Sequence, residues 1–171
     1  MQAPSVSTTV YHLEMLDRAR FAPKACPAGF EAALVAPPDP EVNAAFYRNV
    51  GAPWNWTDRL SWPRGAWRRY VDRVALRTWV GRLHDQPVGY FELETQDEGN
   101  VQIAYFGLLP AFIGQGLGGP LLSAAVGRAW DTPGARRVWL HTCTHDHPRA
   151  LDNYRKRGFA VFRTENVPQK G

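Results

Sequence analysis

The chain has 171 residues, of which 44% are hydrophobic and 21% are charged. This length and composition fit one compact domain with a sizeable core and exclude a disordered chain. The formal net charge of +4 suits a polyanionic ligand, but it also occurs in many proteins that bind no anion, so charge alone identifies no partner.

The sequence favours a cytoplasmic protein. It contains no run of 18 or more uncharged apolar residues, and no basic segment followed by an apolar core opens the chain. The two cysteines, Cys26 and Cys143, lie far apart and indicate reduced thiols rather than a disulfide framework. Basic residues cluster briefly at 64–73 and 155–157, which is typical of solvated helix faces, so we expect neither a nucleic-acid nor a membrane partner.

The first half of the chain predicts few regular elements. A β-rich segment at residues 6–16 is followed by a proline-heavy stretch, 23–40, that we expect to be loop. Helices are expected near residues 41–48 and at 63–73, where Pro63 stands near the N-terminus as helices prefer.

The second half predicts alternating strands and helices. Residues 76–83 and 88–94 alternate as strands do and are joined by Asp85-Gln86-Pro87, which favours a hairpin. The elements expected next are a strand at 101–109, a helix whose apolar residues recur from Leu121 to Ala129, a strand at 137–142, a helix at 148–156 ended by Gly158, and a strand at 159–165. We therefore predict a single α/β domain with a mixed sheet.

The most informative stretch is a glycine-rich loop between a strand-like run and a helix-like run. Four glycines, Gly114, Gly116, Gly118 and Gly119, lie within six residues. Glycine allows positive φ and close approach of a ligand, so the loop's N–H groups and the start of the following helix could hold a phosphate. The spacing also spells a dinucleotide fingerprint, but about a hundred residues precede it and no acidic residue follows at the required place. No Gly-Lys-Ser or Gly-Lys-Thr follows either, which excludes a P-loop.

Three motifs in order carry a resemblance to a known family. They are the strand at 101–110 with its closing proline, the glycine loop running into Pro120-Leu121-Leu122, and the Ala-x-x-x-Tyr-x-x-x-Gly-Phe pattern from Ala150 to Phe159. Together they cover residues 75–165 and resemble the GNAT superfamily of acetyl-CoA-dependent N-acetyltransferases. The resemblance implies a single GNAT-like domain at 1–171, with a mixed, mostly antiparallel sheet flanked by helices, and a splayed fourth strand that leads into a pyrophosphate-binding loop.

The resemblance also implies the cofactor, acetyl-CoA, with coenzyme A as product. The residues that it assigns to cofactor binding are Phe106, Gly107 and Leu108 for the pantetheine arm, Gly114, Gln115, Gly116, Leu117, Gly118 and Gly119 for the pyrophosphate, and His147 and Asn153 on the last motif. Two positions depart from the family pattern. Ile113 stands where the family loop has Arg or Gln, and His147 stands where an Asn is common.

The implied reaction is direct attack of a primary amine, from a small molecule or a peptide, on the acetyl group. Tyr154 matches the family's general acid toward the coenzyme A thiolate. The family's glutamate base corresponds to Gln102, which cannot accept a proton at neutral pH but could orient a water. Glu92 and Glu94 share one face of the preceding strand, so either could take the proton, and both could equally be solvent-exposed strand carboxylates.

The acceptor is expected to meet the helices at 40–73. Trp54 and Trp56 with Asp58 could bind an ammonium group through cation–π and ionic contacts. Four tryptophans lie within fourteen positions here, and we expect at least half of them to be core or interface anchors.

Two other function classes stay open. One is a GNAT-like module that binds acyl-CoA as a sensor without turnover, which Ile113 and Gln102 permit. The other is a zinc protein using His141, Cys143 and His145, which would share a face of an extended strand, although their spacing is not that of familiar zinc modules. Edge strands and exposed tryptophans leave a homodimer as an option.

Overall fold

The computed structural model describes residues 7–168. Its seven strands form one sheet in the order β2-β3-β4-β5-β6-β1-β7, in which the β5–β6 pair alone is parallel. The strands are β1 (Ser7–Met15), β2 (Phe30–Leu34), β3 (Leu76–Leu83), β4 (Gln86–Thr95), β5 (Asn100–Leu108), β6 (Arg137–Cys143) and β7 (Ala160–Pro168). The α-helices are α1 (Pro40–Gly51), α2 (Arg64–Val71), α3 (Gly118–Trp130) and α4 (Ala150–Arg157).

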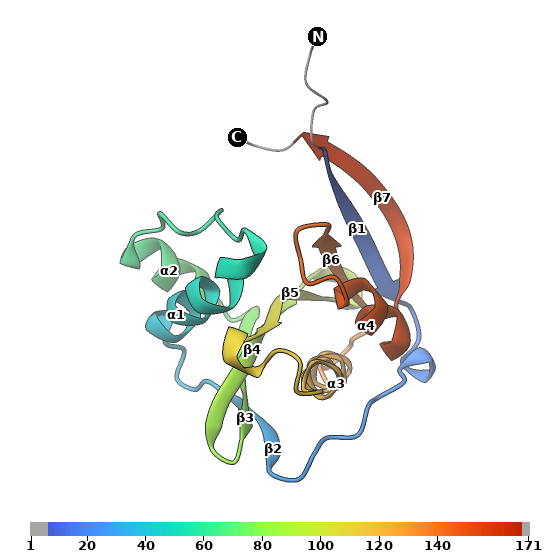
Figure 1. Cartoon of the computed structure of the whole chain (residues 1–171), viewed down its shortest axis with the longest axis horizontal. Helices are drawn as coiled ribbons and strands as arrows, with labels where there is room; N and C mark the ends of the chain where they lie inside the picture. The colour runs from blue at the N-terminus through green and yellow to red at the C-terminus, as the bar shows by residue number, and fades with distance from the viewer. Residues whose placement is uncertain (1–6, 169–171) are drawn as a thin grey trace.

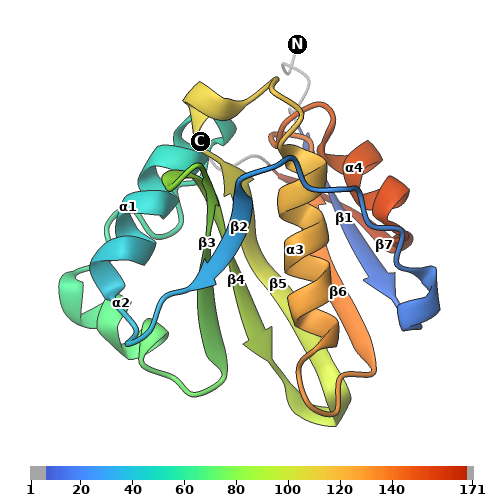
Figure 2. The ribbon, with the colours of Figure 1, turned by 90° about the horizontal axis from the view of Figure 1, so that it is seen from below.

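The helices cover opposite faces of the sheet. Figure 1 shows α1 and α2 on one side of β4 and β5, with α3 and α4 on the other, and Figure 2 shows α3 lying along the strands. Strand alternation explains this division: Phe91 and Leu93 of β4 belong to the core beneath α3, whereas Glu92 between them reaches Asn43 of α1.

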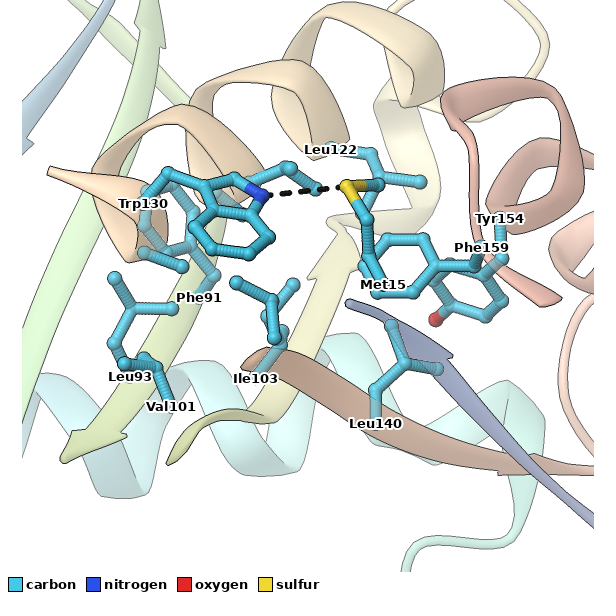
Figure 3. Close-up of a cluster of buried hydrophobic side chains, with 14 of the residues drawn as sticks. Met15, Phe91, Leu93, Val101, Ile103, Leu122, Trp130, Leu140, Tyr154 and Phe159 are labelled. Atoms are coloured by element: carbon cyan, nitrogen blue, oxygen red, sulfur yellow. Dashed lines mark hydrogen bonds between the residues drawn. The ribbon is translucent and has the colours of Figure 1, made fainter. Parts of the chain in front are cut away.

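The main core lies between the sheet and α3 (Figure 3). The buried residues of α3 recur at helical spacing and form one apolar stripe: Leu121, Leu122, Ala125, Val126 and Ala129. Trp130 continues the stripe and donates its indole N–H to the sulfur of Met15, 3.2 Å away. This packing holds the start of α3 against β4 and β5, where the glycine loop ends.

Most predicted elements are confirmed, as is the mixed sheet. The expectation that residues 23–40 are all loop is wrong, because β2 lies within them and pairs with β3 at the sheet edge. Only Phe30 and Ala32 of β2 pack on the core, so the segment lacks a strong apolar alternation. The hairpin turn also differs: His84 and Asp85, both at positive φ, make it, and Gln86 already belongs to β4.

No local sequence pattern predicts where β1 lies in the sheet. It lies between β6 and β7 and pairs antiparallel with both. The two ends of the described chain thus complete the sheet together. Among residues 7–168, the helices are all too short or too polar to cross a membrane.

Candidate active site

The site begins where two neighbouring strands part. Parallel pairing of β5 and β6 is confined to Asn100–Arg137, Val101–Val138 and Gln102–Trp139. Beyond Gln102, β5 continues to Leu108 and β6 to Cys143 without pairing to each other. The predicted splayed strand is therefore present. It is the fifth strand of the chain rather than the fourth, because β2 was not predicted.

A cavity of about 850 Å³ opens between the parted strands. Phe106, Gly107 and Leu108 line it from β5, and Leu140 and His141 are among the residues that line it from β6. A Cβ on Gly107 would lie 2.4 Å from Cγ1 of Val50, so glycine at this position allows α1 to approach the strand. The cavity is thus bounded by both helical layers.

The glycine loop forms one end of the cavity. Gly114 and Gly116 have φ of 83° and 75°, conformations that glycine adopts without strain, and a Cβ on either would contact no atom within 4 Å. The loop anchors on Leu117, which is 2% exposed, and α3 then starts without a side-chain cap. The first N–H groups of α3 therefore remain available to an anion.

The other predicted cofactor residues divide into two groups. Gly118, Gly119, His147 and Asn153 line the cavity, and the side chain of Asn153 donates to the Gly118 carbonyl at 3.1 Å, which ties α4 to the first turn of α3. Gln115 does not line it, because its side chain donates back to the Ala111 carbonyl at 3.0 Å.

This end of the cavity is basic. The cations that line it are Lys24, Arg149, Lys156 and Arg157. Two guanidinium nitrogens of Arg157, Nε and Nη1, are buried without a hydrogen-bond partner among the described residues. Unpartnered buried donors beside an open glycine cradle fit a pyrophosphate group, which offers several anionic oxygens.

Tyr154 lies farther along the cavity and is 7% exposed. Its ring packs edge-on against Phe106 and Phe159, and in the described part of the chain no group accepts a hydrogen bond from its hydroxyl. Burial, and to a lesser extent the charge of Asp146, raises the pKa of Tyr154 far above its usual range. The hydroxyl is thus a free donor that stays protonated at neutral pH.

The predicted proton-transfer residues lie away from this cavity. Glu92 is 1% exposed, and its carboxylate accepts from Asn43 at 3.0 Å and from Tyr70 at 3.3 Å. Gln102 accepts from Gln96 at 2.9 Å, at the end of β5 that still pairs with β6. Neither lines the cavity, so the structure separates both from Tyr154.

Glu94 is likewise engaged elsewhere. Its carboxylate accepts from Arg73 at 2.8 Å and from Gln96 at 2.9 Å. Partial burial by itself would raise the pKa of Glu94, but the hydrogen bonds from Gln96 and Arg73, together with the charge of Arg73, hold it below its usual value. Glu94 belongs to a surface ion pair.

Glu92 has a partner that the sequence pattern did not indicate. Nη1 of Arg59 lies 3.6 Å from Oε2 of Glu92, and the two side chains are 13% and 1% exposed. The guanidinium is surrounded by the rings of Trp62, Trp67, Tyr70 and Tyr105, whose centres lie 4.0–5.8 Å away. Trp62 and Trp67 therefore pack against the Arg59 guanidinium.

Trp54, Trp56 and Asp58 do line the cavity. Trp56 packs against Tyr47 and Tyr105, and its indole N–H points to Asp146, 3.4 Å away. Trp54 meets the ring of His147 edge-on. The four tryptophans thus split evenly between cavity wall and packing.

Asp146 is a cavity residue that sequence reasoning missed. Its carboxylate accepts hydrogen bonds from the Thr142 hydroxyl and from the Cys143 backbone N–H, which closes the turn after β6. The signal was present as an acidic residue inside the histidine-rich run from His141 to His147. That run holds no metal site in the region from Ser7 to Pro168, where no three His, Cys, Asp or Glu side chains gather closely enough.

Comparisons with known proteins agree with this geometry. A family model described as the acetyltransferase (GNAT) family matches residues 42–159. No curated protein sequence matches the chain.

Solved structures with the same fold include two GCN5-related N-acetyltransferases. The one from Kribbella flavida has a TM-score of 0.66 and 23% identity over 92% of this chain. The one from Sphaerobacter thermophilus has a TM-score of 0.72 and 15% identity over 95% of it. The chain spans 58% and 53% of their lengths, respectively.

A third neighbour is an aminoglycoside acetyltransferase from an uncultured soil metagenomic sample, solved in complex with sisomicin. It has a TM-score of 0.62 and 17% identity, with 75% of this chain and 87% of that chain covered. At these identities the neighbours establish the fold, and the family model, which covers more than half of the chain, establishes the family. The chain belongs to the acetyltransferase (GNAT) family.

Proposed function

We propose that the protein transfers an acetyl group from acetyl-CoA to a primary amine of a small molecule or peptide. The observation that carries this proposal is the continuous cavity between β5 and β6, which runs from the glycine loop past Tyr154 to Trp54 and Trp56. It joins an anion cradle, a proton donor and an aromatic wall in one space.

Acetyl-CoA supplies the acetyl group as a thioester, which an amine can attack directly. The glycine loop and the first turn of α3 would hold its pyrophosphate. Phe106, Gly107 and Leu108, which pair with β4 but not with β6, would hold the pantetheine arm along their free edge. Backbone N–H groups on the parted strand are also suitable donors for the oxygen that gains charge during acyl transfer.

Tyr154 would donate its proton to the departing sulfur. A hydroxyl that is protonated at neutral pH and free of other partners suits this task. Its packing between Phe106 and Phe159 holds the ring in place.

The amine's proton would leave through a group other than Glu92 or Gln102. Asp58, His141 and Asp146 all line the cavity and can accept a proton directly or through water. We assign proton removal to this set.

The acceptor would bind among residues 40–73. Trp54 and Trp56 offer aromatic faces, and Asp58, which is exposed at the cavity rim, offers a negative charge. This combination favours a cationic amine. An aminoglycoside acetyltransferase among the structural neighbours is consistent with such an acceptor.

The test has two stages. Thermal unfolding is measured with saturating acetyl-CoA or coenzyme A, and with NADH and ATP as controls. Ligand at 100 times its Kd contributes about 2.7 kcal/mol, which raises Tm by about 5–10 °C for a domain of this size. A shift confined to the two coenzymes supports the cofactor, and amine-dependent release of coenzyme A across an amine panel then identifies the acceptor.

A second candidate is an acyl-CoA sensor of the same fold that does not turn over. The separation of Glu92 and Gln102 from the cavity favours it. Coenzyme binding without coenzyme A release for any amine in the panel would support the sensor, and release with one amine would eliminate it.

A further inference from the structure

Residues 17–29 cross the cofactor end of the molecule and are called here the N-terminal strap. Figure 2 shows this segment passing over α3 on its way to β2. The strap is tied at two points: the Ala22 N–H donates to the Arg157 carbonyl at 2.9 Å, and the Lys24 N–H donates to the Ser123 hydroxyl at 2.8 Å. It lies outside residues 42–159, the part matched by the family model.

Close packing fixes the strap against the end of α4. Gly158 has a φ of 112°, and a Cβ there would lie 2.0 Å from the Arg20 carbonyl oxygen. A larger residue would push the strap away. The position of Lys24 over α3 therefore depends on the backbone of α4.

Arg157 points its guanidinium at the first turn of α3. Its Nη1 lies 3.2 Å from the place that a Cβ on Gly119 would occupy. Nη1 and Nε are buried and have no partner in the described chain. A buried donor without a partner costs free energy, and an anion at the start of α3 would remove that cost.

Lys24 reaches the same turn from the strap. Its Cδ lies 2.5 Å from the same Cβ position on Gly119, so the lysine stem covers the glycine. The cavity-lining carboxylate nearby, Asp152, is already paired with Lys156 at 2.9 Å. Two cations thus flank one uncapped helix start.

We infer that Arg157 and Lys24 bind the pyrophosphate of coenzyme A, and that they supply from α4 and the strap the polar contact that Ile113 cannot make. This inference rests on the proposed function. The pyrophosphate and the 3′-phosphate of coenzyme A both offer phosphate oxygens to a cation. We assign the contact to the pyrophosphate because both side chains lie beside Gly119, in the helix start proposed to hold that group.

The experiment is calorimetric titration of the full chain with coenzyme A. Arg157→Leu and Lys24→Met should each weaken binding by about 10- to 100-fold, the range for losing one charge-assisted hydrogen bond. Arg155→Leu and Arg20→Met remove the same charge from exposed positions that do not line the cavity, and they should change Kd less than twofold. Arg157→Lys should recover part of the loss.

Two further measurements test which phosphate Arg157 contacts and whether Arg157 supports the fold instead. With 3′-dephospho-coenzyme A, the loss caused by Arg157→Leu should persist in full; its disappearance would move Arg157 to the 3′-phosphate and overturn the pyrophosphate assignment. Without ligand, Arg157→Leu should be at least as stable to urea as the wild type, because an unpartnered donor is removed. A less stable variant would mean that Arg157 supports the fold instead.

The two proposals fail in distinguishable ways. Wild-type protein that does not bind coenzyme A overturns the proposed function and this inference with it. Wild-type protein that binds coenzyme A, together with an unchanged Kd for Arg157→Leu, overturns this inference alone.

Discussion

Two arginines on opposite faces of the sheet show how the side covered by α1 and α2 differs from the side covered by α3 and α4. Arg59, beneath α1 and α2, faces the Glu92 carboxylate and four aromatic rings. Arg157, beside the start of α3, has two buried nitrogens and no partner in residues 7–168. Nη1 of Arg59 is likewise buried without a hydrogen-bond partner among these residues, but it lies 3.6 Å from the Glu92 carboxylate, so only Arg59 has its charge matched by another side chain.

The difference separates support of the fold from binding. A buried charge that is matched internally holds two elements together, here the segment after α1 and strand β4. A buried donor that lacks a counter-charge weakens the folded protein on its own, and at Arg157 this cost is the reason for the ligand proposed above. The same contrast separates Glu92, which is fully engaged, from Tyr154, whose hydroxyl is free.

Breaking the matched pair should have the largest effect. Arg59→Met leaves the Glu92 carboxylate buried without its counter-charge, so the free energy of unfolding should fall by about 3–5 kcal/mol in urea titrations. Adding Glu92→Leu to that variant should restore much of the loss. Arg64→Met, which breaks an exposed pair with Glu41, should cost less than about 1 kcal/mol. Equal losses of unfolding free energy for Arg59→Met and Arg64→Met would show that the buried pair supports the fold no more than the exposed pair does.

The free hydroxyl of Tyr154 should matter for rate and not for stability. Tyr154→Phe is expected to lower kcat by about 100-fold, or about 2.7 kcal/mol, with the Kd for acetyl-CoA and the Tm unchanged. Steady-state kinetics with the identified amine and titration with acetyl-CoA measure both quantities. Tyr70→Phe, at a half-buried tyrosine off the cavity, is the control and should keep kcat. Full activity of Tyr154→Phe would exclude it as the acid.

The aromatic wall should affect the acceptor alone. Trp54→Leu should raise the KM for a cationic amine by about 2- to 30-fold, the equivalent of one cation–π contact, because Trp54 lines the cavity at its acceptor side. The KM for acetyl-CoA, measured on the same variant, should not move. A change in both constants would show that Trp54 supports the whole cavity and does not recognise the amine.

The smallest effect should appear in the pH dependence of stability. Burial raises the pKa of Glu92 above its usual value of 4.5, although Arg59, Asn43 and Tyr70 act in the opposite direction. The folded protein then holds this proton more tightly than the unfolded chain does. The resulting stability is complete below pH 4.5 and is lost as pH rises through the raised pKa. Glu92→Gln should remove this component, so the stability of wild type relative to Glu92→Gln should decline with rising pH; a parallel pair of profiles would contradict the shift.

Much of the structure around the glycine loop and α4 could be predicted because its signals are local. The glycines of the loop, the start of α3 and the Tyr154 motif each act within one turn or one helix, and positive φ at Gly114 and Gly116 is a property of the residue type. The contacts beneath α1 and α2 could not be predicted in the same way. Arg59 and Glu92 meet only because α1 folds over β4, and strand alternation placed Glu92 on a face without saying what covers that face.

The sequence by itself therefore determined most of the elements other than β2, the glycine-rich turn before α3 and the place of Tyr154 on α4, since these follow from backbone preferences and periodicity over short stretches. Only the tertiary structure decided that β1 lies between β6 and β7, that Glu92 and Gln102 lie away from the cavity, and that Lys24 and Arg157 meet at Gly119. These are contacts between segments far apart in the chain, and their free energy depends on which surfaces pack together rather than on any local pattern.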